Sequence, residues 1–320
     1  MPVMDLKPAD CPTLDIESPK WFQHAVARPV TSHTAHYNGC ALHYLRWPNT
    51  HDTGDAAPAA KPGLIFLHGG GAHANWWRFI APFFADDFHV IAPDLSGMGD
   101  SGRRQAYDAT TRAHEIDAVV SHAGLYTHAN RPYVVGHSFG GFTGIRYCAL
   151  YGERLAGFVM ADTPIRPPAE AAAHLAARPE ADAVARNYPD YDSALVRFRL
   201  RPRQTCANEF IVEFIARHSI TRNADGWTWK FDPNSLGKNR HAEPFSEYLA
   251  AITCRTAIVY GEDSAVTTEA VVDYMRTLLA SRSPVVPVPD AQHHLFLDQP
   301  LAFVAALRGV LANWRIALTC

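Results

Sequence analysis

The segment VVGHSFGGF, residues 134–142, decides the fold of this chain. It starts with β-branched residues and leads into the apolar segment FTGIRYCALYG, so it predicts a buried strand, a tight turn and a helix. Gly136 and Gly140 stand two residues before and after Ser138, in the pattern G-x-S-x-G. Because glycine lacks a Cβ atom, this spacing permits a turn so sharp that the serine hydroxyl is exposed. The pattern marks Ser138 as a candidate nucleophile, and the alternative is a turn serine or a helix N-cap.

Apolar runs separated by helical patterns continue along the chain. Each run is rich in Val, Ile and Leu and ends in glycine or polar residues, which is typical of strands in a parallel sheet covered on both faces. The runs are LIFLHGGG (64–71), FHVIAPDLSG (88–97), RPYVVGHS (131–138), LAGFVMADTP (155–164), RTAIVYGED (255–263) and SPVVPVPDAQHH (283–294). We therefore predict an α/β fold with a mostly parallel, doubly wound sheet of about eight strands. A hairpin is predicted at 35–47, around the turn signal Asn38-Gly39.

The alternation is interrupted between about 164 and 250, and this interruption sets the predicted domain organisation. The segment starts alanine-rich and lies between two expected strands, so we interpret it as a mainly helical cap inserted after the sixth strand. The core then comprises 33–163 and 251–320. Residues 1–32 contain several prolines and no periodicity, and are predicted to form an extended N-terminal arm. The polar segment 51–63 is predicted to be a surface loop.

The composition is that of an ordinary globular protein. The 320 residues are 48% hydrophobic and 19% charged, and the net charge of -3 gives no reason to expect nucleic acid or anionic membranes as partners. No apolar run approaches the roughly 18 residues of a membrane span, and the start lacks the pattern of an export signal. The six scattered cysteines are typical of reduced thiols (Cys11, Cys40, Cys148, Cys206, Cys254 and Cys320). We expect a cytoplasmic protein with a small-molecule substrate, no cofactor and no metal; the sequence leaves monomer and dimer open.

Glycines follow the first expected strand of the parallel sheet, in the loop that begins at His68. In such sheets, reactive groups gather beyond the carboxyl ends of the strands. An acyl-transfer enzyme needs two N–H donors aimed at the developing oxyanion, and losing one costs about 3–4 kcal/mol in the transition state. We expect Gly70, with Gly71 as second choice, to provide one donor and Phe139 the other. The glycines alone would also fit phosphate binding, but no G-K-[ST] follows.

A pair of histidines follows the last expected strand, and with it the motifs resemble the α/β-hydrolase fold superfamily over about residues 35–316. In order, the motifs are HGGG, APDLSGMGDSG, G-x-S-x-G-G, a cap insertion and HHLFLDQP. The resemblance implies that His293 is the catalytic base and that His294 packs beside it or sets its tautomer. It also implies that DLSGMGDSG is a structural turn, with Met98 where the family usually has histidine.

A serine nucleophile narrows the chemistry that the resemblance implies. Relatives with aspartate at this position are haloalkane dehalogenases and epoxide hydrolases, whereas Ser138 implies an acyl-enzyme and attack on a carbonyl carbon. We expect a serine hydrolase acting on a small carboxylic ester. The main chemical alternative is a C–C bond hydrolase for diketone-type ring-cleavage products, although that group typically has asparagine in place of His137. Amide, lactone and thioester substrates stay open, as does a non-catalytic ligand-binding relative, which would usually have lost the serine or histidine.

The acid of the expected triad has more than one candidate. The family usually carries it in a G-x-x-D pattern, but the stretch from Gly261 has Ser264 at that position. Asp263 lies one residue early, and Asp162 ends the preceding strand, where some branches of the superfamily place the acid. The acid accepts the Nδ1–H bond of the histidine and fixes its tautomer. We favour Asp162, then Asp263, then Glu262.

Aromatic residues near the glycine loop and in the cap indicate an apolar substrate pocket. We expect Trp76, Trp77 and His137 to line it. For the aromatic residues of the cap, simple packing onto the core is the alternative (Tyr188, Phe198, Phe214, Trp227, Trp229 and Phe231). One arginine of VRFRLRPR (196–203) could pair with a substrate carboxylate, and the alternative is that all four are solvated (Arg197, Arg199, Arg201 and Arg203).

Overall fold

The computed structural model describes residues 4–6, 16–48, 61–126, 131–176, 186–236, 243–279, 281 and 283–316. Most of the predicted surface loop 51–63, together with Cys11 and Cys320, lies outside the described residues. The other four cysteines are free thiols. Within the described ranges, no helix is both long enough and apolar enough to cross a membrane.

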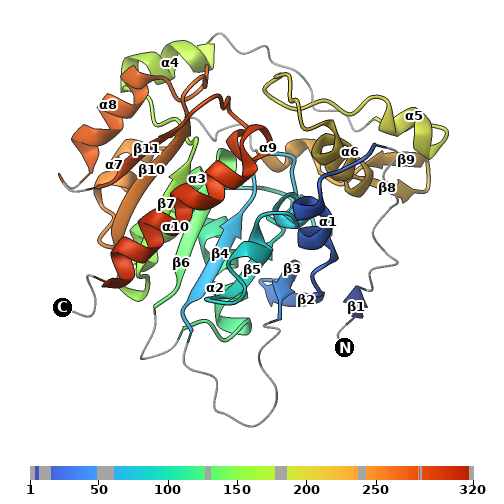
Figure 1. Cartoon of the computed structure of the whole chain (residues 1–320), viewed down its shortest axis with the longest axis horizontal. Coiled ribbons are helices and arrows are strands. Elements are labelled where there is room, and N and C mark those ends of the chain that lie inside the picture. Colours follow the sequence, from blue (N-terminus) through green and yellow to red (C-terminus); the bar gives the residue numbers. More distant parts are fainter. Residues whose placement is uncertain are drawn as a thin grey trace.

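One large sheet forms the centre of the molecule (Figure 1). Its order is β1-β2-β3-β5-β4-β6-β7-β10-β11, and the six strands from β5 to β11 in this order run parallel. The strands are β1 (Met4–Leu6), β2 (Val30–Tyr37), β3 (Cys40–Trp47), β4 (Gly63–Leu67), β5 (His89–Pro93), β6 (Tyr133–His137), β7 (Gly157–Ala161), β10 (Arg255–Gly261) and β11 (Val285–Val288). The predicted mostly parallel, doubly wound sheet is confirmed: the strands from β2 onward are the expected eight, and β1 adds a short edge strand.

Both faces of the sheet are covered because its central strands are apolar on both sides. In β4, Leu64 and Phe66 belong to one hydrophobic cluster, and Ile65 and Leu67 belong to the other. The first cluster includes residues of α10 (Pro300–Ile316), and the second includes residues of α2 (Ala109–His122), α3 (Phe139–Tyr151) and α8 (Glu269–Leu278). Because the parallel strands share one direction, their carboxyl ends meet at one edge of the sheet, where ligand sites form.

β2 and β3 form the predicted hairpin. Asn38 has a φ of 44° and Gly39 a φ of 76°, the left-handed backbone of a two-residue hairpin turn. β2 begins at Val30 rather than at residue 35, because residues 31–34 also pair with β3.

The N-terminal segment corrects one expectation. An extended arm is predicted for residues 1–32, but residues Lys20–Ala27 form helix α1. Phe22 of this helix is fully buried. Its ring contacts the core residue Phe79 and the insertion residues Phe210 and Phe214, which belong to α6 (Glu209–His218). The helix thus fills an apolar gap between the core and the insertion, a tertiary effect that its own sequence does not reveal.

The segment predicted as a cap contains helices and also a hairpin. Its elements are α4 (Pro168–Ala176), α5 (Tyr191–Leu195), α6, the antiparallel pair β8 (Ile220–Asn223) and β9 (Gly226–Trp229), and α7 (Phe245–Ala250). α5, α6 and the hairpin lie together at the upper right of Figure 1. α7 packs instead on α3, where the rings of Phe142 and Phe245 are 4.8 Å apart. Residues 177–185 and 237–242 lie outside the described part of the chain, and the domain boundaries stay predictions.

The predicted structural turn DLSGMGDSG joins the insertion to the core. The Gly99 N–H donates to the Lys230 carbonyl at 2.7 Å, and the Asp232 N–H donates to the Gly97 carbonyl at 2.6 Å. Gly97 and Gly99 have φ values of 77° and 57°, which glycine adopts without strain. The turn therefore presents backbone groups that the insertion can pair with.

Asp94 holds this turn from below. Its buried carboxylate accepts hydrogen bonds from His43 Nδ1 at 2.7 Å and from the N–H groups of Ala74 and Asp100 at 2.6 Å and 2.8 Å. Burial alone would raise the pKa of Asp94, but the hydrogen bond and charge of His43 hold that pKa well below its usual value. Asp94 is therefore a charged anchor of the scaffold.

Several histidines are largely buried, and burial lowers the pKa of each. They are His68, His73, His137, His218 and His294. For His218 the pKa falls to about 4. The folded state therefore favours the neutral imidazole at these positions.

Replacing Phe22 by alanine tests the role of α1. We expect Phe22→Ala to lower the free energy of unfolding by about 3–5 kcal/mol, because it leaves a cavity among three aromatic rings. The exposed neighbour His24 provides the control, and His24→Ala should change that free energy by less than about 0.5 kcal/mol. Equal denaturant midpoints for both variants would contradict the packing role.

Lowering the pH tests the buried histidines. Unfolded histidine has a pKa of about 6.5, so below that pH the unfolded chain binds protons that the folded imidazoles exclude. His43 acts in the opposite sense: burial lowers its pKa, but the hydrogen bond to Asp94 raises it overall. Because the lowered pKa values outnumber the raised one, the free energy of unfolding should fall between about pH 7.5 and 5.5, by about 1.4 kcal/mol per pH unit for each net proton. Denaturant titrations that give one value at both pH values would refute this.

Candidate active site

The turn between β6 and α3 holds Ser138 in a backbone conformation that residues other than glycine rarely adopt. Ser138 has a φ of 51° and a ψ of -115°, and its N–H donates to the Ala161 carbonyl at 3.0 Å. A Cβ atom on Gly136 would lie 2.6 Å from the Gly140 carbonyl oxygen, and one on Gly140 would lie 2.5 Å from the His68 oxygen. Both glycines are therefore required by close backbone approach, as the sequence pattern predicts. A strained backbone of this kind persists only where the surrounding packing holds it. Such residues occur most often at functional sites.

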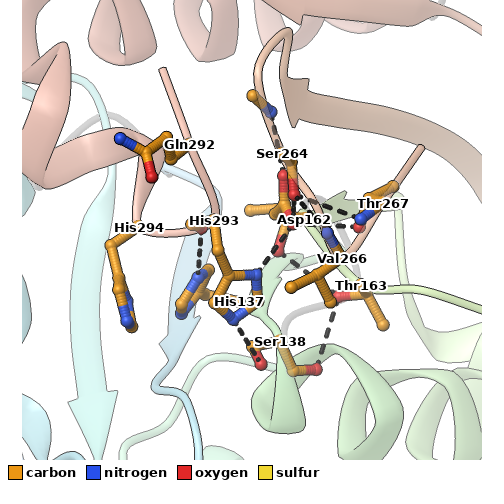
Figure 2. A network of polar contacts seen from close by, with 12 residues as sticks. His137, Ser138, Asp162, Thr163, Ser264, Val266, Thr267, Gln292, His293 and His294 are labelled. Carbon is orange, nitrogen blue, oxygen red and sulfur yellow. Dashed lines mark hydrogen bonds and ion pairs between the residues drawn. The ribbon is translucent and has the colours of Figure 1, made fainter. Parts of the chain in front are cut away.

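Three residues from three strand ends meet in one hydrogen-bonded row (Figure 2). His293, which follows β11, has its Nε2 atom 3.0 Å from Ser138 Oγ. Its Nδ1 atom lies 2.8 Å from Oδ1 of Asp162, which follows β7. Asp162 and His293 are 0% and 3% exposed. The structure thus brings together the predicted nucleophile, base and favoured acid; their catalytic roles stay predictions.

The Asp162 carboxylate is surrounded by donors. Its Oδ1 atom accepts hydrogen bonds from Ser264 Oγ at 2.8 Å and Thr267 Oγ1 at 2.9 Å, and its Oδ2 atom accepts one from the Gly261 N–H at 2.9 Å. With His293 these make four partners for one buried anion. A buried carboxylate needs such compensation for its lost water.

The loop after β10 explains why the usual acid is missing. Ser264 occupies the position where the family pattern places the acid, and its hydroxyl donates to Asp162. Asp263 and Glu262 are exposed. Among the described residues, Asp162 is the carboxylate bonded to His293, so the alternatives Asp263 and Glu262 do not reach the imidazole.

The glycine loop lies against the turn that carries Ser138. A Cβ atom on Gly70 would be 3.4 Å from Phe139 Cβ, so these two residues are neighbours. Within the described part of the chain, the N–H groups of Gly70, Gly71 and Phe139 have no hydrogen-bond acceptor. Gly71 has a φ of 70°, and a Cβ atom on it would lie 4.0 Å from the Phe231 ring. Free donors beside the serine fit the predicted oxyanion hole, with Gly70 and Phe139 as the closer pair.

His68 fixes the start of this loop, a role that the sequence analysis did not assign. The Leu95 N–H donates to His68 Nε2 at 3.0 Å. Nδ1 therefore carries the proton and donates to the Gly69 carbonyl at 2.8 Å. Both bonds require the neutral ring, in agreement with the lowered pKa that burial gives His68. The signal in the sequence was its position between a strand and three glycines.

His137 supports the backbone of His293. It is 1% exposed, and its Nε2 atom lies 3.0 Å from the His293 carbonyl oxygen, to which it donates. Its ring packs on Phe296 and His293 at centroid distances of 4.9 Å. The expectation that His137 lines the substrate pocket is therefore corrected: its side chain is buried between His293 and Phe296. His294 packs against both rings, 5.0 Å from that of His293 and 5.5 Å from that of His137.

The two tryptophans predicted for the pocket differ in position. Trp77 is 0% exposed and stacks on Phe296 at 4.6 Å, so its pocket role is corrected to one in the core. Trp76 is 6% exposed and lies 5.5 Å from His294. The sequence analysis missed Leu236, whose Cδ2 atom would be 2.8 Å from a Cβ on Gly70. Its signal was only its place in the insertion.

The aromatic and basic residues of the insertion mostly serve packing and solvation. Tyr188, Phe198, Trp227 and Trp229 contact one another or Tyr191 within the insertion. The four arginines of 196–203 are exposed. This favours the solvated alternative over a substrate contact.

Two groups of side chains have ligand atoms close enough to share a metal ion. One comprises His137, His293 and His294, and the other His43, Asp94 and Asp100. In the first, His293 already bonds Ser138 and Asp162, so an ion there would have to displace one of them. In the second, Asp94 is engaged by the scaffold bonds described above. The Asp94 carboxylate therefore needs no ion to satisfy it.

Comparison with known proteins finds hydrolases among the relatives of this chain. Over 277 residues the chain is 24% identical to esterase Rv0045c of Mycobacterium tuberculosis. The alignment covers 85% of this chain and 86% of that protein. It is 35% identical to a soluble epoxide hydrolase of Corynebacterium sp., but over 113 residues, so that this match spans about a third of each protein.

Solved structures share the fold. The crystal structure of E-2-(acetamidomethylene)succinate hydrolase superposes with a TM-score of 0.71 at 20% identity, over 88% of this chain and 98% of that one. The structure of esterase Rv0045c gives a TM-score of 0.64 at 21% identity, over 88% and 90%. Residues 64–307, the greater part of the sequence, match the family described as the alpha/beta hydrolase family. With its fold and this match in agreement, the chain belongs to the alpha/beta hydrolase family.

Proposed function

We propose that this hydrolase cleaves a small carboxylic ester through an acyl-enzyme intermediate. The observation that carries the proposal is the hydrogen-bonded row Ser138–His293–Asp162 beside free backbone donors. In an acyl-enzyme mechanism the hydroxyl needs a base at its proton, and the base needs an orienting acid. All three are present at bonding distance.

The proposed mechanism gives each step to a named residue. His293 Nε2 takes the proton of Ser138 as Oγ bonds the carbonyl carbon, and the carbonyl electron pair moves to the oxygen. The N–H groups of Gly70 and Phe139 hold that oxyanion. His293 then gives the proton to the leaving alcohol as the C–O bond breaks. Water attacks the acyl group with His293 again as base, which releases the acid and restores Ser138.

Asp162 fixes the direction in which His293 works. Its Oδ1 atom accepts the Nδ1–H bond, so the Nε2 lone pair faces Ser138. It also stabilises the imidazolium that forms during each proton transfer.

Two observations favour an ester over other bonds. The relative aligned over most of the chain is an esterase. The rival class, C–C bond hydrolases, typically has asparagine at position 137, where this chain has a buried histidine bonded to the His293 carbonyl.

We also propose a cytoplasmic location, which the free thiols of the described cysteines support.

A fluorophosphonate probe tests the class of the protein. The native chain should become labelled at Ser138 and hydrolyse short-chain esters, because the probe requires an activated serine. Ser138→Ala should abolish both signals. Labelling that persists in Ser138→Ala, or a native chain that is never labelled, would overturn the proposal. A screen across acyl-chain lengths, with one ring-cleavage diketone included, separates ester from C–C chemistry.

Two aspartate variants test the acid. Asp162→Asn should lower kcat about 10⁴-fold, because an amide at this position favours the wrong tautomer of His293. Asp263→Asn is the matched control: its carboxylate is exposed, so kcat should stay within about threefold of the native value. Steady-state kinetics on one ester suffice. Similar losses in both variants would remove Asp162 from its assigned role.

A further inference from the structure

Three side chains from separate parts of the chain hold the peptide groups around His293. The Gln292 N–H donates to Asp298 Oδ2 at 2.8 Å, and His137 Nε2 donates to the His293 carbonyl at 3.0 Å. The His294 N–H donates to Gln204 Oε1 at 2.9 Å. Side-chain hydrogen bonds therefore fix the backbone at Gln292, His293 and His294, and with it the position of the imidazole.

Gln204 is the member of this set that comes from the insertion. Its amide also donates from Nε2 to both carboxylate oxygens of Asp298, at 3.0 Å and 2.9 Å. The orientation of the amide follows from its partners, because the His294 N–H needs an acceptor and the carboxylate needs a donor. One amide thus links the peptide after His293 to the carboxylate that holds the peptide before it.

A neighbouring contact from the same segment does not touch these peptides. Asn208 Nδ2 donates to the carbonyls of Leu297 and Asp298 at 2.7 Å and 3.0 Å. Asn208 therefore fastens the insertion to the same loop without contacting the groups that flank His293. This difference separates docking of the insertion from placement of the imidazole.

We propose that Gln204 is a positioning residue for His293, through which the docked insertion sets the place of the imidazole relative to Ser138. The inference rests on the proposed function. His293 Nε2 must stay within bonding distance of Ser138 Oγ, now 3.0 Å, while Nδ1 keeps its bond to Asp162. A displacement of about 1 Å in such an arrangement can cost about 10²-fold in rate. The insertion thus completes the catalytic apparatus as well as covering the core.

Matched alanine variants test this role. Gln204→Ala should lower kcat for an ester, and the rate of fluorophosphonate labelling, by about 10- to 100-fold with KM within about threefold, because the imidazole and not the substrate site is disturbed. Asn208→Ala should lower the thermal midpoint of unfolding about as much as Gln204→Ala does, because each removes hydrogen bonds that dock the insertion. It should leave kcat within about threefold of the native value. If Gln204→Ala leaves kcat and labelling unchanged, or if Asn208→Ala loses as much kcat, the inference is wrong.

An isosteric variant separates position from folding. Gln204→Glu keeps an acceptor for the His294 N–H but sets a carboxylate against Asp298. Burial raises the pKa of Asp298, and burial raises the pKa of the adjacent Cys206 thiol to about 11, so the thiol stays neutral. Glu209, whose charge also acts on Cys206, is exposed, as is Arg203 beside Gln204. A proton shared by the two carboxyl groups would restore the donor.

The pH profile gives the expected signature. The kcat of Gln204→Glu, relative to native, should rise as the pH falls from about 8 to about 6, whereas the ratio for Gln204→Ala should stay constant. A constant ratio for both variants would contradict the inference. A native chain that is not labelled at Ser138 refutes the proposed function itself; native labelling with unaffected Gln204 variants refutes only this inference.

Discussion

The site depends on one buried anion, the carboxylate of Asp162, and on the four donors that surround it. An unpaired charge at that depth would cost several kcal/mol. The last residue of β10 therefore directs its N–H toward it, and the loop that follows directs two hydroxyls. The fourth donor is His293, whose ring is thereby oriented at Ser138. The hydrogen bonds that compensate the buried charge of Asp162 therefore also align Asp162, His293 and Ser138.

The parallel sheet brings these groups together because they follow strands that are neighbours in it. β6, β7, β10 and β11 are neighbours in the sheet order, so their carboxyl ends deliver Ser138, Asp162, the hydroxyl loop and His293 side by side. Ser138 and Asp162 both have positive φ values, 51° and 45°, and close packing of the surrounding backbone keeps them there. Glycines at 136 and 140 make that packing sterically feasible. The rigid sheet thus holds strained turns in place.

Local sterics made part of this predictable from the sequence. The G-x-S-x-G turn and the Asn38-Gly39 hairpin depend on a few adjacent residues, and both positions could be located in advance. The choice between Asp162 and Asp263 could only be ranked, because it depends on the path of a loop rather than on residue type. Helix α1 and the core position of Trp77 were missed for another reason: each is set by contacts with segments far away in the sequence. The same holds for Gln204, which no local pattern marks.

The location of Asp162 has a mechanical consequence. Asp162 lies directly before the segment 164–250, so the chain that leaves the core to form the insertion starts where the imidazole's partner ends. Thr163, between them, packs its Oγ1 atom against the carbonyls of Gly136 and Ser138. A displacement at the base of the insertion would therefore reach the turn that carries Ser138 and Asp162 together. An exchange of this insertion between relatives would therefore also disturb the surroundings of Ser138 and Asp162, unless its first few residues were retained with the core.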